Sequence, residues 1–419
     1  MALLLAVLAG TLSGTDSSLL GVPVLAIYTF LGTLFMNALK MLIVPLIFSS
    51  IITGVSAMGD GESMGRLGGK TLLYYLLTSM LAILVGLTAV NLLQPGIIDG
   101  VPARDAIGLS ETDTSAIAGA VQGQGMGEVV NIFVRMVPPN IVSAAAEGQM
   151  LGLIFFSLLF GYFMTRISGE PARVLKDFWQ GVFAVMMKIT DWVMGFAPIG
   201  VFALVAKVVA TTGIAVFLPL MVFFLTVLGA LATHLLITLP LMLKLFARVS
   251  PARHFKAMAP ALLTAFSTAS SSATLPLTMD CVEKRAGVSN RVTSFVLPLG
   301  ATVNMDGTAL YECVAAMFIA QAYGIELGFA TQFTVVMVAL LTSIGVAGIP
   351  SASLVAITII LTAIGLPVEA VGLILAVDRV LDMCRTSVNV FSDSCGAVLI
   401  GRLEGETGIL NDAQLNRPV

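Results

Sequence analysis

Long apolar runs, separated by short polar segments, dominate this chain. Residues 71–93 and 217–243 contain no Lys, Arg, Asp or Glu, and each exceeds the roughly 20 apolar residues that a helix needs to cross a bilayer. The pattern therefore predicts several membrane-spanning helices. The apolar run at residues 1–14 is too short to cross, and we expect it to be the second half of a first helix or a short interfacial segment.

Two other apolar segments are interrupted at their centres by small and polar residues. They are TAFSTASSSATLP at 264–276 and TSIGVAGIPSAS at 342–353. Neither predicts an unbroken helix, and both favour re-entrant helical hairpins, because irregular backbone at membrane depth is tolerated only beside protein or a watery cavity. Each interrupted segment is followed by a predicted spanning helix with polar residues at its middle. These polar residues are NMDGT at 304–308 and DRVLDMCRTSVN at 378–389. This order predicts inverted repeats with a binding site between them, although two loosely packed Gly/Ser helices remain the alternative.

Composition and charge narrow the class of protein. The chain is 58% hydrophobic and 11% charged, which excludes an ordinary soluble domain. Its net charge of −3 excludes the basic balance of a nucleic-acid partner. Lys and Arg gather in a few loops that the positive-inside rule places in the cytoplasm. Residues 94–127 carry four acidic side chains against Arg104 alone, so we expect this loop on the outer side.

Metal and catalytic centres find little support in the sequence. The four cysteines show no CxxC or Cys/His spacing, and His234 and His254 are the only histidines, so we expect free thiols and structural or interfacial histidines. The serines at 270–272 have no matching Lys or His to activate a nucleophile. We expect them to bind a ligand, and we expect 342–353 to form a flexible lid or, alternatively, a kinked helix.

The last predicted helix carries a polar stripe. At about 100° per residue, five of its side chains fall within roughly 80° of one another. They are Asp378, Asp382, Arg385, Asn389 and Asp393. A charge at mid-membrane costs at least about 2.5–3.5 kcal/mol, so the stripe is expected to face protein, water or a ligand.

Two interpretations of the stripe compete. Asp378, Asp382 and Arg385 could form a salt-bridge network that only joins helices. The added oxygen ligands of Asn304 and Asp306, and the excess of negative charge, instead suit small cations. Because a guanidinium binds a carboxylate with two parallel hydrogen bonds, we interpret Arg385 as a substrate anchor.

Taken in order, the motifs resemble the glutamate transporter family, the dicarboxylate/amino acid:cation symporters that include archaeal aspartate transporters and animal excitatory amino-acid transporters. The resemblance covers essentially the whole chain. It is carried by KMLIVPLIFSSIITG (40–54), YYLLTS (74–79), APIGVFAL (197–204), SSSATLP (270–276), LPLGATVNMDGTALYE (297–312), SIGVAGIP (343–350) and DMCRTSVNV (382–390).

The resemblance implies a substrate site. Arg385 would hold the side-chain carboxylate with Asp378 orienting it, and Asp382 would take the amino group. The other implied substrate ligands are Ser271, Thr308, Ile349 and Asn389.

It also implies three sodium sites and no organic cofactor. The first would use Gly300, Asn304, Asn389 and Asp393. The second would use Tyr75, Thr78, Ser79, Asn304 and Asp306. The third would use Thr302, Met305, Ser343, Ile344 and Val346.

The implied fold is an all-α polytopic membrane protein with about eight transmembrane helices and two re-entrant helical hairpins. It would be an elevator-type homotrimer with a fixed scaffold and a sliding transport unit. The expected divisions are scaffold at 1–70 and 128–214, outer loop at 96–127, and transport unit at 71–95 and 215–419. Within the last part, hairpins are expected near 252–283 and 330–365, and core helices near 289–321 and 367–402.

Four positions depart from the family pattern. Ala269 stands where archaeal members place an arginine, and Met383 where animal members place one; Arg379, one turn earlier, could replace that charge. Glu312 matches the animal carriers and not the archaeal glutamine. Since burial favours its neutral form, Glu312 is a candidate proton site, with a structural ion pair as the alternative. Ser353 stands where the family has a glycine.

The sequence thus predicts a multi-pass plasma-membrane symporter, not an enzyme, that takes up aspartate or glutamate with sodium ions. A C4-dicarboxylate carrier and a proton-coupled glutamate symporter are alternatives within the family. Asp382 argues against the first, because a substrate without an amino group would leave this carboxylate unpaired. An anion channel is the alternative from another class.

Overall fold

A computed structural model describes residues 2–15, 17–19, 21–56, 62–107, 134, 137–147, 150–212, 217–343 and 353–411. These residues are mainly helical. The elements of the first half are α1 (Ala2–Ser13), β1 (Ser18–Leu19), β2 (Val22–Pro23), α2 (Val24–Ser56), α3 (Glu62–Leu93), β3 (Ile97–Ile98), β4 (Val101–Pro102), α4 (Ala103–Ile107), α7 (Ile141–Ala146), α8 (Met150–Met164), α9 (Glu170–Gly195) and α10 (Ala197–Thr212). The strands pair as antiparallel ribbons, β1 with β2 and β3 with β4.

The second half supplies the remaining helices. They are α11 (Phe217–Thr233), η2 (His234–Thr238), α12 (Leu239–Met242), η3 (Leu243–Ala247), α13 (Pro251–Thr268), α14 (Ser271–Asp280), η4 (Cys281–Ala286), α15 (Asn290–Val303), α16 (Asp306–Ala322), α17 (Phe329–Ser343), α18 (Ser353–Ala363), η5 (Val368–Ala370) and α19 (Val371–Leu403). Of these, η2, η3 and η4 are π-helical and η5 is a 3₁₀ turn.

Two helical stretches of the described chain are long and apolar enough to cross a membrane, Leu67–Leu93 and Leu218–Ala247. They contain nearly all of the two runs that the apolar pattern predicts. The second stretch continues without a break through α11, η2, α12 and η3. Shorter apolar helices accompany them, so the total of about eight spans stays a prediction.

Two helix pairs lie at the interrupted apolar segments. The first pair breaks at Ala269, whose φ of 51° is left-handed and ends α13. Ser270 then caps α14, its side chain accepting from the Ala273 amide at 3.2 Å. The second pair, α17 and α18, flanks residues 344–352, which lie outside the described residues. The members of each pair pack against each other, and their re-entrant position in the membrane stays a prediction.

The core helix expected near 289–321 is two helices. Asn304 and Met305 have non-helical dihedrals between α15 and α16. The break is stabilised by side chains, because Asn304 and the adjacent Asp306 bond to residues of α3 and α19 in place of a continuous helical ladder. In contrast, α19 is one uninterrupted helix close to the expected range 367–402.

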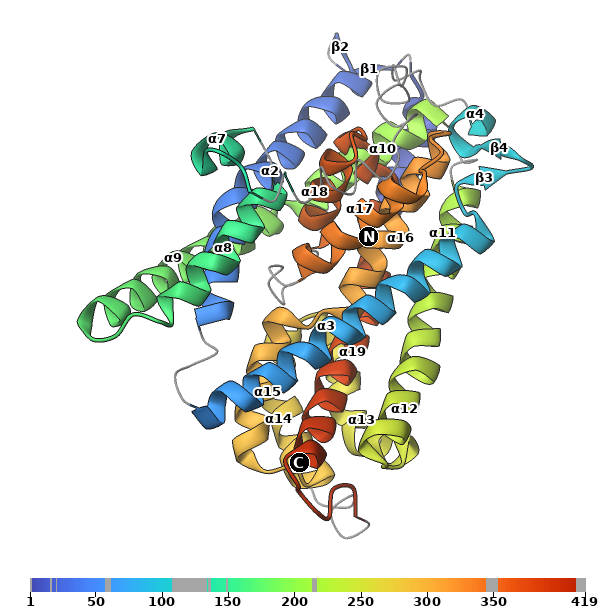
Figure 1. The fold of residues 1–419 in the computed structure, drawn as a ribbon. Coiled ribbons are helices and arrows are strands. Elements are labelled where there is room, and N and C mark those ends of the chain that lie inside the picture. Colours follow the sequence, from blue (N-terminus) through green and yellow to red (C-terminus); the bar gives the residue numbers. More distant parts are fainter. Residues whose placement is uncertain are drawn as a thin grey trace.

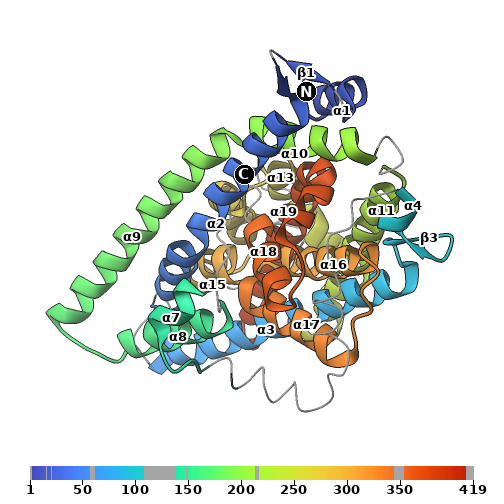
Figure 2. The ribbon, with the colours of Figure 1, turned by 90° about the horizontal axis from the view of Figure 1, so that it is seen from above.

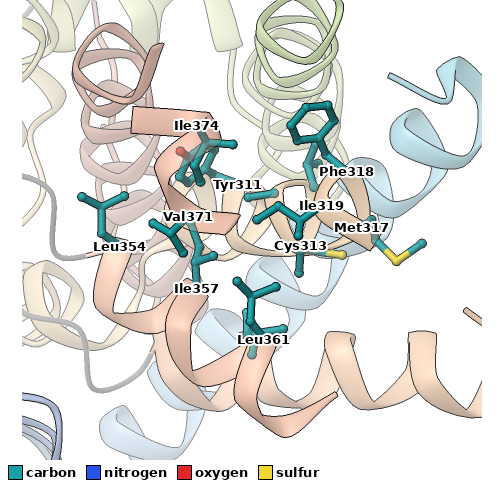
Figure 3. Packing of buried hydrophobic residues seen from close by; sticks show 14 of the residues in the cluster. Tyr311, Cys313, Met317, Phe318, Ile319, Leu354, Ile357, Leu361, Val371 and Ile374 are labelled. Atoms are coloured by element: carbon teal, nitrogen blue, oxygen red, sulfur yellow. The ribbon is translucent and has the colours of Figure 1, made fainter. Parts of the chain in front are cut away.

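Two apolar cores meet along α19. The first joins α16, α17 and α18 to the beginning of α19, and Figure 3 shows Tyr311, Leu354 and Ile374 gathered in it. The second joins α13, α15 and η3 to the end of α19. Val388 belongs to the first core and Val390 to the second, so Asn389 lies at their junction. Asn389 is itself polar and buried at this junction.

Two groups of helices differ in shape. In Figures 1 and 2, α9 projects away from the other helices, and α2 packs against α8, α9 and α10. The helices α3, α11 and α13–α19 form a denser group with α19 near its centre. The side chains of Phe178 and Trp192 on α9 are exposed, so this helix offers an apolar face to its surroundings.

Candidate functional site

The side chain of Arg385 is buried in the middle of α19, with 1% of its surface exposed. Its Nη2 donates to Oδ1 of Asp378 and to Oδ1 of Asp382, both at 3.0 Å. All three residues lie on the stripe that helical periodicity predicts. The two carboxylates pair with the guanidinium, fix its plane and leave the three side chains with one net negative charge.

Two other side chains reach Arg385 from neighbouring helices. Nη1 donates to Oγ of Ser353, the first residue of α18, at 2.6 Å. The ring of Tyr311 on α16 covers one face, with Cζ at 3.8 Å from its centroid, a distance suited to a cation–π contact. We call Asp378, Asp382, Arg385, Ser353 and Tyr311 the arginine cluster.

The arginine cluster has an unused donor. Among the described residues, Nε of Arg385 is buried and has no hydrogen-bond partner. An unpaired donor on a buried charged group costs free energy, so the geometry favours an added acceptor at this position. A carboxylate is the acceptor that a guanidinium binds most strongly.

Arg379 lies one turn before Met383 but contributes little to the cluster. Its side chain is 54% exposed, and Nη1 lies 3.9 Å from Oδ2 of Asp382. An exposed pair at this distance contributes at most about 1 kcal/mol. That Arg379 replaces the arginine that animal members have at the position of Met383 stays a prediction.

Asn389 joins α19 to the first turn of α16. Its Oδ1 accepts from the Gly307 amide at 2.8 Å, and its Nδ2 donates to Oγ1 of Thr308 at 3.1 Å. Gly307 permits this approach, because a Cβ there would lie 2.7 Å from the carbonyl oxygen of Arg385. The sequence-predicted residues Thr308, Arg385 and Asn389 are thus brought together.

A second polar group surrounds Asp306, the first residue of α16, which is fully buried. Its Oδ1 accepts from the Ser79 hydroxyl at 2.7 Å and its Oδ2 from the Ser392 hydroxyl at 2.6 Å. Nε2 of His234 lies 3.1 Å from the same Oδ2. Three helices, α3, α16 and α19, and the segment η2 therefore converge on one carboxylate.

Asn304 links Asp306 to the other buried carboxylate of the region. Its Nδ2 donates to Oδ1 of Asp393 at 2.9 Å and to Oγ of Ser392 at 3.1 Å, while its Oδ1 accepts from Thr78 at 3.2 Å. We call this set the carboxylate cluster. Its members are Thr78, Ser79, His234, Asn304, Asp306, Ser392 and Asp393.

Tyr75 and Gly300 border the carboxylate cluster. The Tyr75 hydroxyl donates to the Val296 carbonyl at 2.6 Å. A Cβ on Gly300 would collide with the carboxylate of Asp393 and lie 2.8 Å from the Tyr75 hydroxyl. The absence of a side chain on Gly300 therefore lets α15 approach α19 and α3 closely.

The carboxylate cluster has more negative than positive charge. The described partners of Asp306 and Asp393 are hydroxyls, an amide and one imidazole, with no Lys or Arg among them. Hydroxyl, amide and carboxylate oxygens are hard ligands that suit small cations. The arrangement is chemically able to hold a cation between α3, α16 and α19.

Glu312 is fully buried on α16, one turn after Thr308. Its Oε2 accepts from the Thr342 hydroxyl at 2.9 Å, and Oε1 has no hydrogen-bond partner among the described residues. No cation of the described chain lies within ion-pair distance, so the structural ion pair with Arg379 is not observed. Thr342 lies in the last turn of α17, so Glu312 touches the helix that leads to the expected lid.

Other sequence-predicted residues lie outside these clusters or outside the description. Ser271 is buried at the start of α14, and the Ser343 hydroxyl bonds to its own helix at Leu340. Met305 is buried between α15 and α16, and Thr302 belongs to α15, though its side chain is not described. Ile344, Val346 and Ile349 fall on 344–352, outside the described residues.

Sequence reasoning missed three contacts. Ser392 lies only about 20° beyond the edge of the α19 stripe, so extending the stripe would have included it. A lone histidine in the apolar run 217–243 was a weak signal for the contact of His234 with Asp306. Nothing in the sequence indicated that Tyr311 would cover Arg385.

Comparisons with known proteins agree with the motifs. The description "Sodium:dicarboxylate symporter family" matches residues 1–403. A "Proton/sodium-glutamate symport protein" of Bacillus caldotenax is 36% identical over 376 residues, covering 90% of this chain and 87% of the relative. A "Proton/glutamate-aspartate symporter" of Escherichia coli is 34% identical, covering 89% and 84%. "Excitatory amino acid transporter 3" of Homo sapiens is 36% identical, covering 90% and 79%.

These matches extend over most of the chain and of each relative, and they include the helices that carry both polar clusters. The chain therefore belongs to the sodium:dicarboxylate symporter family, the glutamate transporter family that its motifs resemble, and is a multi-pass membrane transporter and not an enzyme.

Proposed function

We propose that this transporter takes up aspartate or glutamate together with sodium ions. The observation that carries the proposal is the buried guanidinium of Arg385, which has an unpartnered Nε in a site that two carboxylates already fill. Such a donor attracts an anionic group, and the two aspartates attract an ammonium group. An acidic amino acid supplies both.

The roles proposed for the substrate ligands are those that the family resemblance implies, and the charge pattern of the site is compatible with them. Arg385 binds the side-chain carboxylate and Asp378 holds the guanidinium in position. Thr308 contributes a hydroxyl to the same carboxylate, Asp382 binds the amino group, and Asn389, whose amide donates to Thr308, binds the main-chain carboxylate. Ser271 and Ile349 are proposed to complete the site.

We assign the cations to the carboxylate cluster and its surroundings. Asp306 and Asp393 provide the negative charge, so a bound cation offsets what would otherwise oppose binding of an anionic substrate. The relatives' printed names include both protons and sodium. Sodium is favoured here by the number of neutral oxygen ligands. The proposed sodium ligands are Tyr75, Thr78, Ser79, Gly300, Thr302, Asn304, Met305, Asp306, Ser343, Ile344, Val346, Asn389 and Asp393.

For the architecture we propose a plasma-membrane homotrimer that works as an elevator. A scaffold at 1–70 and 128–214 stays fixed, while a transport unit at 71–95 and 215–419 slides across the bilayer. The exposed apolar face of α9 supports the assignment of that helix to the scaffold, because such a face needs lipid or another subunit beside it.

A C4-dicarboxylate is the competing substrate. Asp382 is not unpaired in the structure, since it bonds Arg385, so the sequence argument against this substrate is weaker than expected. The net charge of the site still argues against a C4-dicarboxylate. Arg385, Asp378 and Asp382 together carry one net negative charge, and a dicarboxylate adds two more negative charges without the ammonium group that offsets one of them.

The test is uptake into proteoliposomes with an imposed sodium gradient. Labelled aspartate or glutamate should accumulate against its own gradient, and succinate and alanine should not. Preferred uptake of succinate would contradict the substrate assignment. Full uptake with only a proton gradient would contradict the sodium assignment, and substrate-independent anion flux without accumulation would indicate a channel.

A further inference from the structure

Ser353 is the only partner of Arg385 in the described chain that carries no charge and no ring. Its hydroxyl accepts from Nη1 at 2.6 Å, and the side chain is buried. Ser353 begins α18, so it approaches Arg385 from a different helix than the two aspartates of α19. Its contribution to the site is therefore separable from theirs.

The remaining donors of Arg385 show where a substrate carboxylate can bind. Nη2 has two hydrogens and two carboxylate partners, so it is fully occupied. Nε is unpartnered among the described residues, and one hydrogen of Nη1 remains after the bond to Ser353. Nε–H lies on the guanidinium edge shared with Nη2, away from Ser353, whereas the free hydrogen of Nη1 lies next to it. A substrate carboxylate that accepts from this hydrogen of Nη1 therefore lies beside Ser353.

The hydroxyl of Ser353 has two effects on such a carboxylate. Because it accepts from Nη1, its own hydrogen stays available, and no acceptor takes that hydrogen among the described residues. It can therefore donate to the substrate. Its oxygen and Cβ also occupy volume beside the guanidinium, which shortens the space left for the substrate side chain.

We propose that Ser353 is a specificity-determining residue that makes the site prefer aspartate to glutamate. This inference rests on the proposed binding of the substrate side chain by Arg385. Aspartate places its carboxylate beside the Ser353 hydroxyl, where it accepts from this hydroxyl and from the free hydrogen of Nη1, and glutamate must fit one more methylene into the same shortened space. Selection by one methylene is worth roughly 10-fold or more in a tight pocket.

A graded series of variants at this position tests the proposal. KM values for aspartate and glutamate are measured in proteoliposomes for the wild type and for Ser353→Gly, Ser353→Ala and Ser353→Thr. The ratio of the glutamate KM to the aspartate KM should fall about 10-fold in Ser353→Gly, fall less in Ser353→Ala, and rise in Ser353→Thr. A ratio within one protein does not depend on how much of that protein folds.

Thr358→Ala is the matched control. Thr358 is a buried hydroxyl residue of the same helix, and it bonds to the backbone of its own helix at Leu354, not to Arg385. Its removal should leave the KM ratio unchanged. A ratio that shifts equally in Thr358→Ala would mean that any disturbance of α18 changes selectivity, and it would overturn the assignment to Ser353.

The outcomes separate this inference from the proposed function. If the wild type takes up acidic amino acids but the ratio stays constant along the series, only the role of Ser353 is wrong. If the wild type prefers glutamate, that role is also wrong. If the wild type takes up neither substrate, the proposed function fails and the inference fails with it. Because Ser353→Gly and Ser353→Thr shift the ratio in opposite directions, either one decides the matter if the other does not fold.

Discussion

The arginine cluster and the carboxylate cluster are built on the same two helices, α16 and α19, yet they balance charge differently. In the first, Arg385 is a fixed cation bonded to two carboxylates and covered by Tyr311. In the second, Asp306 and Asp393 have only hydroxyl, amide and imidazole partners in the described chain. The first cluster is suited to an anionic group, and the second to a mobile cation.

The helix α19 carries residues of both clusters, Arg385 in the first and Asp393 in the second. The two clusters meet at Asn389, which lies where the two apolar cores join. Its amide touches Gly307 and Thr308 of α16, next to Asp306 in the chain. Occupation of one cluster can therefore change the geometry of the other through the first turn of α16, which is the physical requirement for coupling between two ligands.

The largest expected effect comes from removing the fixed cation. Arg385→Ala leaves two buried carboxylates without their partner and removes the proposed substrate anchor. Loss of one member of a buried charge pair costs about 2–5 kcal/mol, so aspartate uptake should fall by roughly 30-fold or more. Initial uptake rates in proteoliposomes measure this.

Arg379→Ala is the matched control for that variant. It removes an arginine of the same helix whose side chain is 54% exposed and 3.9 Å from Asp382. Its uptake should stay within about threefold of wild type, as an exposed ion pair is weak. Normal aspartate affinity in Arg385→Ala would remove the distinction between the two clusters.

The second prediction concerns the cation that we assign to the carboxylate cluster. Asp393→Asn keeps the shape of the side chain and removes one of the two negative charges of the carboxylate cluster. The sodium concentration for half-maximal uptake should rise about 10-fold, equivalent to about 1.4 kcal/mol. Asp280→Asn, at an exposed ion pair with Lys284, should leave it unchanged. An unaltered sodium requirement in Asp393→Asn would place the cation elsewhere.

A smaller effect is expected at the contact between the clusters. In Gly307→Ala the new Cβ would lie 2.7 Å from the backbone oxygen of Arg385, so α16 and α19 must separate. Overpacking of this kind costs about 1–3 kcal/mol, and thermal unfolding in detergent should occur at a lower temperature.

Gly229→Ala on α11 provides the contrast, because its Cβ would meet nothing within 4 Å. Alanine is the better helix former by about 1 kcal/mol, so this variant should be as stable as the wild type or more stable. Equal melting temperatures for Gly307→Ala and the wild type would show that the two helices are not in close contact.

The arginine cluster can be predicted from the sequence more fully than the carboxylate cluster. The stripe of α19 follows from helical geometry alone, so Asp378, Asp382 and Arg385 are found together as expected. The break at Asn304 and Met305 was not predicted, because no proline or glycine stands at those two positions and the break depends on partners in α3 and α19. Contacts between distant segments, such as His234 with Asp306, leave almost no trace in local patterns.

The smallest expected effect concerns Glu312, which belongs to neither cluster by hydrogen bonding and is held by Thr342 of α17. In Glu312→Gln the side chain keeps its shape and can still bond Thr342, but it can no longer bind and release a proton. If Glu312 carries a proton with the substrate, net uptake should lose its pH dependence while exchange of internal for external aspartate continues. Net uptake and exchange, measured across a series of pH values in the same proteoliposomes, test this.

Thr342→Val separates proton carriage from support of the helix. It removes the hydroxyl that bonds Glu312 and leaves the carboxyl in place, so the pH dependence of net uptake should shift but persist. A structural role of Glu312 predicts the opposite pattern, in which Glu312→Gln and Thr342→Val lose net uptake and exchange together. Unchanged pH dependence in a folded Glu312→Gln protein would remove Glu312 as a proton carrier, and the carboxylate cluster would then be the only proposed site for a coupled cation.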